Sequence, residues 1–196
     1  MKGPLIDDID AEILTFMKEA PDTSQAEIAK ALGISQPTVS KRIRKLKDMG
    51  ALNIVAGVDV KRLGLHLAKV DIATSDPNGI LDMLGECPFF INGFNTTGSK
   101  NFTILLACDD YATLEAIVNH HIRPRSDVTD VDLSIVVSVA REFIAPIQLT
   151  YDREKDAPCG IDCGKCSCWQ AGRCIGCPVT GHYRGHVWRT ADPDAE

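Results

Sequence analysis

The sequence predicts an α+β protein in three parts: an N-terminal winged helix-turn-helix, a ferredoxin-like domain of βαββαβ order, and a small cysteine-rich, metal-bound C-terminal module. Three observations predict this order. Apolar residues recur at helical spacing at the start, strand and helix patterns then alternate, and six of the eight cysteines lie between positions 159 and 177. We therefore expect domains at 1–60, 61–149 and 150–196.

The first two helices are expected before residue 33. Apolar residues at intervals of three and four positions predict a helix over 6–17. A second helix begins after a cap at Thr23 or Ser24, and Glu27 follows Ser24 at the spacing of a capping box. Gly33 is expected to end this helix.

The third helix has a clear beginning. Ser35 is placed to act as its N-cap, and Pro37 stands in the first turn, where a missing N–H group does no harm. The helix is expected to bury Val39, Ile43 and Leu46. The apolar run 51–58 follows and predicts a wing strand.

The exposed face of the third helix predicts DNA binding. Residues 35–49 carry five basic side chains and Asp48 as the single acidic one. Short polar side chains near the start of a recognition helix reach base edges, and cationic ones further along suit phosphates. The candidate contacts are Ser35, Gln36, Thr38, Ser40, Lys41, Arg42, Arg44 and Lys45. The alternative is an ordinary solvated face of a three-helix bundle.

Charge and hydropathy limit the partners. The formal net charge is −6, and residues 61–150 hold seven basic and eleven acidic side chains, so contact with double-stranded DNA is expected only in the N-terminal part. No stretch is long and apolar enough for a membrane span, and the first residues do not resemble a signal peptide. We expect a cytoplasmic protein without a membrane partner.

The middle part has the element order of a ferredoxin-like domain. The pattern predicts strands at 65–74, 89–97, 102–108 and 128–139, and helices at 78–86 and 111–122. Two cysteines of this part, Cys87 and Cys108, are interpreted as small core residues. His120 and His121 are interpreted as charges at a helix end instead of metal ligands.

Residues 5 to about 143 resemble the Lrp/AsnC feast-famine regulators. The resemblance is carried by 5–14, by Ala26-Glu27-Ile28-Ala29 and by 33–43, in the same order as in that family. It implies a transcription regulator that joins a winged helix-turn-helix to a βαββαβ domain. It also implies a homodimer or a higher even oligomer, with a small amino-acid-like effector as a possible ligand.

The resemblance also points to an effector turn. The family has a Gly-x-x-Asp turn between the second and third strands of the middle domain, near its effector pocket. This chain has Gly98-Ser99-Lys100-Asn101 there, followed by Phe102, so the candidate effector residues are Gly98, Asn101 and Phe102. An amide at 101 cannot supply the charge that pairs with an ammonium group. A tight turn that needs Gly98 for its backbone alone is the alternative.

The cysteine cluster predicts a metal site. A cytosolic chain with closely spaced thiols more often binds metal than forms disulfides. The candidate ligands are Cys159, Cys163, Cys166, Cys168, Cys174 and Cys177. Two Cys-x-x-Cys pairs have the spacing that wraps one centre, and neighbouring glycines permit close turns.

Two metal centres fit the cysteine spacing. A [4Fe-4S] cluster is favoured, in part because Pro178 directly follows the last cysteine, and a structural Zn²⁺ is the alternative. The segment also resembles short cysteine-rich modules of the pattern Cys-Gly-x-x-Cys-Gly-x-Cys…Cys-x-Gly-Cys, which are thought to bind metal. In that pattern Cys168 is additional.

These observations predict a regulator whose DNA binding responds to redox state, oxygen or metal supply through an iron-sulfur cluster. One alternative is an Lrp-like regulator that senses a small effector and carries structural zinc. A second is an iron-sulfur electron-transfer or redox protein. No acid/base or nucleophile constellation was found, so an enzyme is not expected.

Overall fold

The computed structural model describes residues 5–191, which form two compact units. The first unit ends at Val55 and the second begins at Ala56. Each unit is considered by itself. The C-terminal segment, expected as a third domain at 150–196, packs with the middle domain in the second unit instead of forming a unit of its own. In this part of the chain, no helix is long and apolar enough to cross a membrane.

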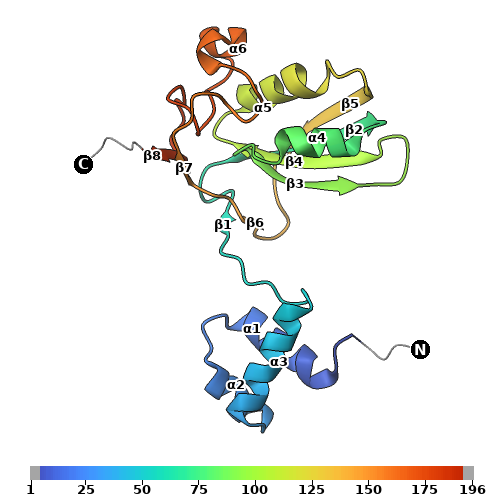
Figure 1. Cartoon of the computed structure of the whole chain (residues 1–196), viewed down its shortest axis with the longest axis vertical. Coiled ribbons are helices and arrows are strands. Elements are labelled where there is room, and N and C mark those ends of the chain that lie inside the picture. Colours follow the sequence, from blue (N-terminus) through green and yellow to red (C-terminus); the bar gives the residue numbers. More distant parts are fainter. Residues whose placement is uncertain (1–4, 192–196) are drawn as a thin grey trace. The chain divides into compact units, whose positions relative to one another are not determined.

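The first unit consists of three helices with capped ends (Figure 1). They are α1 (Asp8–Glu19), α2 (Gln25–Leu32) and α3 (Gln36–Asp48). Ser24 and Glu27 form the expected capping box of α2, and Gly33 ends this helix with a positive φ of 66°. The Ser35 side chain accepts the Thr38 N–H at the start of α3. The three predicted helices are therefore confirmed to within a few residues.

A small apolar core joins the three helices. Ile13, Ile28 and Val39 are at most 1% exposed and come from α1, α2 and α3 in turn. The wing prediction is wrong for residues 51–57, which are irregular. Val58 instead begins the short strand β1 (Val58–Asp59), which pairs with β6 (Ile144–Ala145) inside the second unit.

The second unit contains the predicted βαββαβ domain (Figure 1). Its elements are β2 (His66–Thr74), α4 (Pro77–Leu84), β3 (Phe90–Asn95), β4 (Phe102–Cys108), α5 (Tyr111–Ile117) and β5 (Val128–Ile135). The antiparallel sheet has the order β3-β4-β2-β5, as in a ferredoxin-like domain. A π-helical stretch, Val118–Ile122, extends α5 and brings both histidines at its end into one turn.

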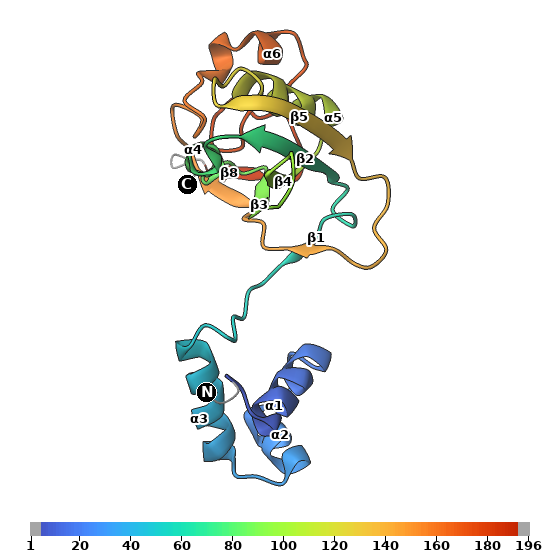
Figure 2. The ribbon, with the colours of Figure 1, turned by 90° about the vertical axis from the view of Figure 1, so that its right-hand side faces the viewer.

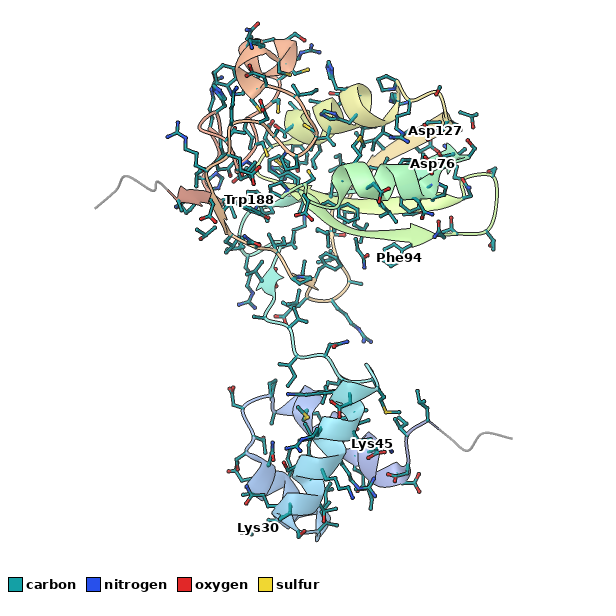
Figure 3. The ribbon with its side chains drawn as sticks, viewed as in Figure 1. Lys30, Lys45, Asp76, Phe94, Asp127 and Trp188 are labelled. Atoms are coloured by element: carbon teal, nitrogen blue, oxygen red, sulfur yellow. The ribbon has the colours of Figure 1, made fainter. Side chains whose placement is uncertain are left out.

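The core of this unit includes a residue from the tail. Ile80 of α4, Leu114 of α5 and Phe102 of β4 are fully buried together. Trp188, far along the chain, is 1% exposed and belongs to the same core. Its ring meets that of Phe89 edge to face, with centroids 5.2 Å apart. The Trp188 side chain is labelled in Figure 3.

The tail is closed into a loop by its own two strands. β7 (Thr150–Asp152) pairs in parallel with β8 (Arg189–Ala191), so the cysteine-bearing residues lie between paired ends. Within the loop are a 3₁₀ turn at Cys163–Lys165 and the short helix α6 (Ser167–Gln170). In both ribbon views α6 lies beside the α5 side of the domain (Figure 2). The tail therefore uses the middle domain as its support.

Candidate DNA-binding surface and thiol cavity

Helix α3 presents a polar face away from its buried residues. Val39, Ile43 and Leu46 are at most 6% exposed, and the first two pack with residues of α1 and α2. Of the predicted DNA contacts, Ser35, Gln36, Thr38, Lys41, Arg44 and Lys45 are exposed and Ser40 and Arg42 are partly buried. The Ser35 hydroxyl is also the helix cap, at 2.8 Å from the Thr38 hydroxyl.

Arg42 and Lys45 have partners within the first unit. The Arg42 guanidinium donates to Asp7 and Asp10 at 2.7 Å, and the Lys45 ammonium lies 3.2 Å from Asp10. The Asp10 side chain is completely buried, so these two cations compensate a charge that water cannot reach. The structure thus gives Arg42 a bracing contact between α1 and α3 that the sequence did not predict.

Electrostatics agree with this bracing contact. The hydrogen bond from Arg42 is the main cause of a lowered pKa for Asp7. Burial by itself raises the pKa of Asp10, but hydrogen bonds from Arg42 and Lys45 outweigh it and the pKa is lowered overall. Lys41 and Arg44 differ, because within residues 5–191 neither has an ion-pair partner. These two exposed cations are the ones most available to phosphates.

The predicted effector turn is occupied by internal contacts. Gly98 has a positive φ of 118°, as a tight turn requires. The Asn101 amide accepts the Thr74 N–H at 2.9 Å and donates to the Thr74 carbonyl at 2.8 Å, so it ties the turn to β2. Phe102 is 0% exposed and belongs to the core. Neither side chain is free to contact a small molecule within this chain.

Five of the six predicted metal ligands surround one cavity. The cavity has a volume of about 70 Å³ and is lined by Cys159, Cys163, Cys166, Cys174 and Cys177. The remainder of its wall is mainly apolar and includes Leu84, Phe89 and Ile117 of the middle domain. The tail therefore brings together thiols that are up to 18 positions apart in the sequence.

Cys168, the sixth predicted ligand, does not line the cavity. It is 2% exposed, and its Sγ lies 2.8 Å from Nε2 of His120. It lies in α6 and lines a different hollow, together with His120 and Ala116. The structure thus separates Cys168 from the other tail thiols, in agreement with its being additional to the cysteine-rich pattern.

Burial and backbone N–H groups act on the cavity thiols in opposite directions. Burial is the main cause of raised pKa values for Cys159, Cys174 and Cys177. Backbone N–H groups oppose the rise, and the Gly176 N–H lies 3.4 Å from the sulfur of Cys174. Such N–H groups stabilise a sulfur that becomes a thiolate on binding metal.

The donor set fits a metal group, whereas the geometry is not that of a preformed single-ion site. Within residues 5–191, no group of three or more Cys, His, Asp or Glu side chains is arranged to hold one ion. The thiols stand around a space instead of converging on a point. Five thiols, an apolar wall and N–H donors are the ingredients that bind iron-sulfur clusters or thiolate-bound zinc.

Two residues of the middle domain also line the cavity, and sequence reasoning missed both. They are Cys87, interpreted from the sequence as an isolated core residue, and His121, interpreted as a helix-end charge. Burial, followed by the nearby His120, lowers the pKa of His121 and favours the neutral form that binds metals. No sequence signal pointed to either, because each is far from the tail along the chain.

Hydrogen bonds from α5 and the loop before it hold the tail in place. The Asp109 carboxylate accepts from the Tyr183 hydroxyl and, at 3.2 Å, from the Val187 N–H. The buried Thr113 hydroxyl accepts the Ile175 N–H at 2.9 Å. Ile175 lies between Cys174 and Cys177, so this bond fixes one wall of the thiol cavity against α5.

Comparison with known proteins bears on the first two parts. The family model described as winged helix-turn-helix DNA-binding matches residues 6–52, the segment that contains α1, α2 and α3. The HTH-type transcriptional regulator Ptr1 of Methanocaldococcus jannaschii is 25% identical over 142 residues, which are 70% of this chain and 96% of Ptr1. The regulatory protein AsnC of Escherichia coli is 26% identical over 143 residues, 70% of this chain and 93% of AsnC.

A solved structure agrees with the observed architecture. The Escherichia coli AsnC structure superposes with a TM-score of 0.64 at 24% identity and covers 71% of this chain and 97% of that one. In sequence and in fold, the chain is similar to Lrp/AsnC-type DNA-binding transcription regulators. These relatives are matched over nearly their whole length by about 70% of this chain, so the chain carries additional residues.

Proposed function

We propose that this regulator controls DNA binding through a [4Fe-4S] cluster held by the tail thiols, which makes it responsive to redox state, oxygen or metal supply. The observation that carries the proposal is the single cavity lined by Cys159, Cys163, Cys166, Cys174 and Cys177. Five thiols exceed the four that such a cluster requires.

The backbone around these cysteines supports the same proposal. Gly176, between Cys174 and Cys177, has a positive φ of 86°, and a Cβ placed on it would lie 2.3 Å from the His182 carbonyl oxygen. Only glycine therefore permits this close loop. Its N–H in turn approaches the Cys174 sulfur, as described above. The loop is thus shaped both to close tightly and to stabilise a thiolate.

The cluster is favoured over a single zinc ion by the arrangement of the thiols. Structural zinc needs four ligand atoms at about 2.0–2.3 Å from one point, whereas within residues 5–191 no three such side chains are arranged around one ion. A cluster, when bound, supplies a redox-active and oxygen-sensitive centre. Structural zinc, with sensing elsewhere, is the alternative outcome of the experiment below.

The chain's own contacts provide the link from the cavity to the rest of the regulator. The tail contacts the middle domain through the ring of Trp188 and through hydrogen bonds to two middle-domain residues, Asp109 and Thr113. Thiols released from a metal group would lose the restraint that holds their loop against α5. In the proposed mechanism, this loosening changes how the middle domains assemble, and so changes the spacing of the α3 helices relative to DNA half-sites.

Elemental analysis of full-length protein purified without oxygen tests the cofactor. We expect about four irons and about four sulfides per chain, with visible charge-transfer absorption that fades in air. A protein with about one zinc and no iron would support the zinc alternative instead. A protein without bound metal would contradict both.

The DNA-binding surface has a test of its own. Replacing Lys41 or Arg44 by Ala should weaken binding to all DNA sequences to a similar degree. Each substitution should also reduce the slope of log K against log salt concentration by about 1, as expected for the loss of one phosphate contact. Lys30, an exposed lysine on α2, provides a matched control. Unchanged affinity in the doubly substituted protein would argue against α3 as the DNA-contacting helix.

A further inference from the structure

The thiol cavity has a wall that belongs to the middle domain. Cys87 lies in the loop between α4 and β3, 72 positions before Cys159, and lines the cavity with the five tail cysteines. Leu84 and Phe89, on either side of it in the same loop region, line the cavity as well. Several residues of this loop region therefore form one wall of the cavity, and Cys87 is the one among them that carries a thiol.

Cys87 is partly buried beside the tail cysteines, whereas Cys108 is buried in the sheet core. Burial is the main cause that raises the pKa of Cys87 to about 12, and the neighbouring Cys159 and Cys174 add to it. Backbone N–H groups of Phe89 and Phe90 oppose the rise. Cys108 offers a contrast, since it is 0% exposed in the sheet core and does not line the cavity.

Cys87 also faces a second, more open hollow. This hollow has a volume of about 180 Å³ and is lined by Cys87 together with Pro146, Gln148 and Tyr151. Cys87 thus lies between the thiol cavity and this hollow. Among the cavity cysteines, Cys87 alone lines both, within the part of the chain that the structure describes.

We propose that Cys87 is a ligand of the metal group held by the tail thiols, so that the group bonds the middle domain directly to the tail. This inference rests on the proposed function, since it requires the tail to bind metal. Such a bond would couple the position of the α4–β3 loop to that of the tail. Phe89 follows Cys87 closely and contacts Trp188, and β3 begins at the next residue, Phe90, as an edge strand of the sheet. Metal loss would therefore release the α4–β3 loop and the tail together.

A variant pair tests the proposal on the full-length holoprotein. Cys87→Ser keeps the size of the side chain, and Cys168→Ser is the matched control, because Cys168 lies against His120 outside the cavity. We expect Cys87→Ser to release its metal to a chelator at least about tenfold faster than wild type, with an altered visible spectrum. Cys168→Ser should match the wild type in both.

A second measurement needs no substitution. Wild-type protein is treated with iodoacetamide before and after metal removal, and each cysteine is quantified by mass spectrometry. The second hollow gives the reagent a path to Cys87, so we expect its labelling rate to rise at least about tenfold on metal removal. Cys108, in the sheet core, is the internal reference and should be unaffected.

The outcomes separate this inference from the proposed function. Suppose that Cys177→Ser loses the metal, that Cys87→Ser releases it at the wild-type rate with the wild-type spectrum, and that Cys87 is labelled equally with and without metal. These results would overturn the role of Cys87 and leave the proposed function standing. A wild-type protein that binds no metal would overturn both. Faster release in Cys87→Ser together with metal-dependent protection of Cys87 supports the proposal even if the variant is somewhat less stable.

Discussion

The DNA-binding unit and the cysteine-rich tail are stabilised by different kinds of contact. In the first, helix caps lie within three residues of the groups they satisfy, as Ser24 and Glu27 do, and a small core of its own joins the helices. In the tail, contacts cross the chain: Trp188 to Phe89, and Val187 to Asp109, 78 positions away. The first unit is stabilised by local caps and by contacts among its own three helices, and the tail by its docking on the middle domain.

This difference has a functional consequence. The core of the first unit contains residues from α1 to α3 and their flanks only, so its fold is expected not to depend on the tail. A docked tail, in contrast, shares its stability with the middle domain. A signal received by the tail is therefore expected to act on the middle domain and leave the fold of the first unit intact.

The largest effect is expected from Trp188→Ala. Loss of this buried ring should destabilise the second unit by about 3–5 kcal/mol, because it leaves a cavity in the core shared with Phe89. Amide hydrogen exchange should accelerate over 56–191 and stay unchanged over 5–55. Trp169→Ala, at a partly buried tail position, is the control and should cost less than about 2 kcal/mol. Unchanged exchange in the middle domain would mean that the tail is independent.

Asp109→Ala should have the next largest effect. The substitution leaves the Tyr183 hydroxyl and the Val187 N–H without their acceptor, at a cost of about 2–3 kcal/mol. Limited proteolysis should then cut the tail faster than in the wild type. Asp82→Ala, at an exposed position of α4, is the control and should change stability by less than about 0.5 kcal/mol and leave the tail protected. Equal protection in both variants would argue against Asp109 as the tail anchor.

Arg42→Ala should destabilise the first unit by about 2 kcal/mol, since Asp10 would stay buried with Lys45 alone. Arg44→Ala, on the same helix without an ion-pair partner in residues 5–191, should leave stability unchanged and weaken DNA binding. Thermal unfolding and DNA titration of both variants measure the contrast. Equal stability of the two variants would remove the bracing role of Arg42.

The same contact predicts a dependence on pH. The lowered pKa values of Asp7 and Asp10 mean that their ionised forms are favoured in the folded state. This contribution to stability is present above about pH 4 and is lost as the pH falls through the lowered pKa values. Wild type should therefore lose this contribution in acid, and Arg42→Ala should show a weaker dependence. Parallel pH profiles would contradict the assignment.

Ser24→Ala should give the smallest effect, about 1 kcal/mol, confined to the first unit. The substitution removes the side-chain acceptor for the Glu27 N–H and ends the capping box. Ser126→Ala, at an exposed loop position of the second unit, should change stability by less than about 0.5 kcal/mol. A cost for Ser24→Ala as low as that of the control would mean that the cap contributes nothing measurable.

The sequence predicted the features that depend on neighbouring residues and missed those that depend on distant ones. Caps, helical spacing and strand patterns are local, so α1 to α3 and the βαββαβ order were predictable. Residues 51–57 have the apolar composition of a strand but no pairing partner, so composition alone predicted a wing strand that does not form. Pairing depends on residues far away, which periodicity does not reveal.

The candidate sites show the same limit. Cysteine spacing predicted the tail thiols, and five of them share a cavity. The positions of Cys87 and His121 beside them could not be predicted, since they depend on how the tail docks. Likewise, positive charge marked Arg42 as a DNA contact, while the buried Asp10 that holds it becomes visible only when α1 packs on α3.

The most direct test of control by the tail is a DNA titration with a single anaerobic preparation of full-length protein. One half keeps its metal and the other is treated with a chelator, and Kd is measured at one salt concentration for DNA selected from a random pool. The two values should differ by at least about tenfold, and Cys163→Ser/Cys177→Ser should bind like the metal-free half. Equal Kd values for the metal-bound, metal-free and air-oxidised forms would contradict a regulatory role for the thiol cavity.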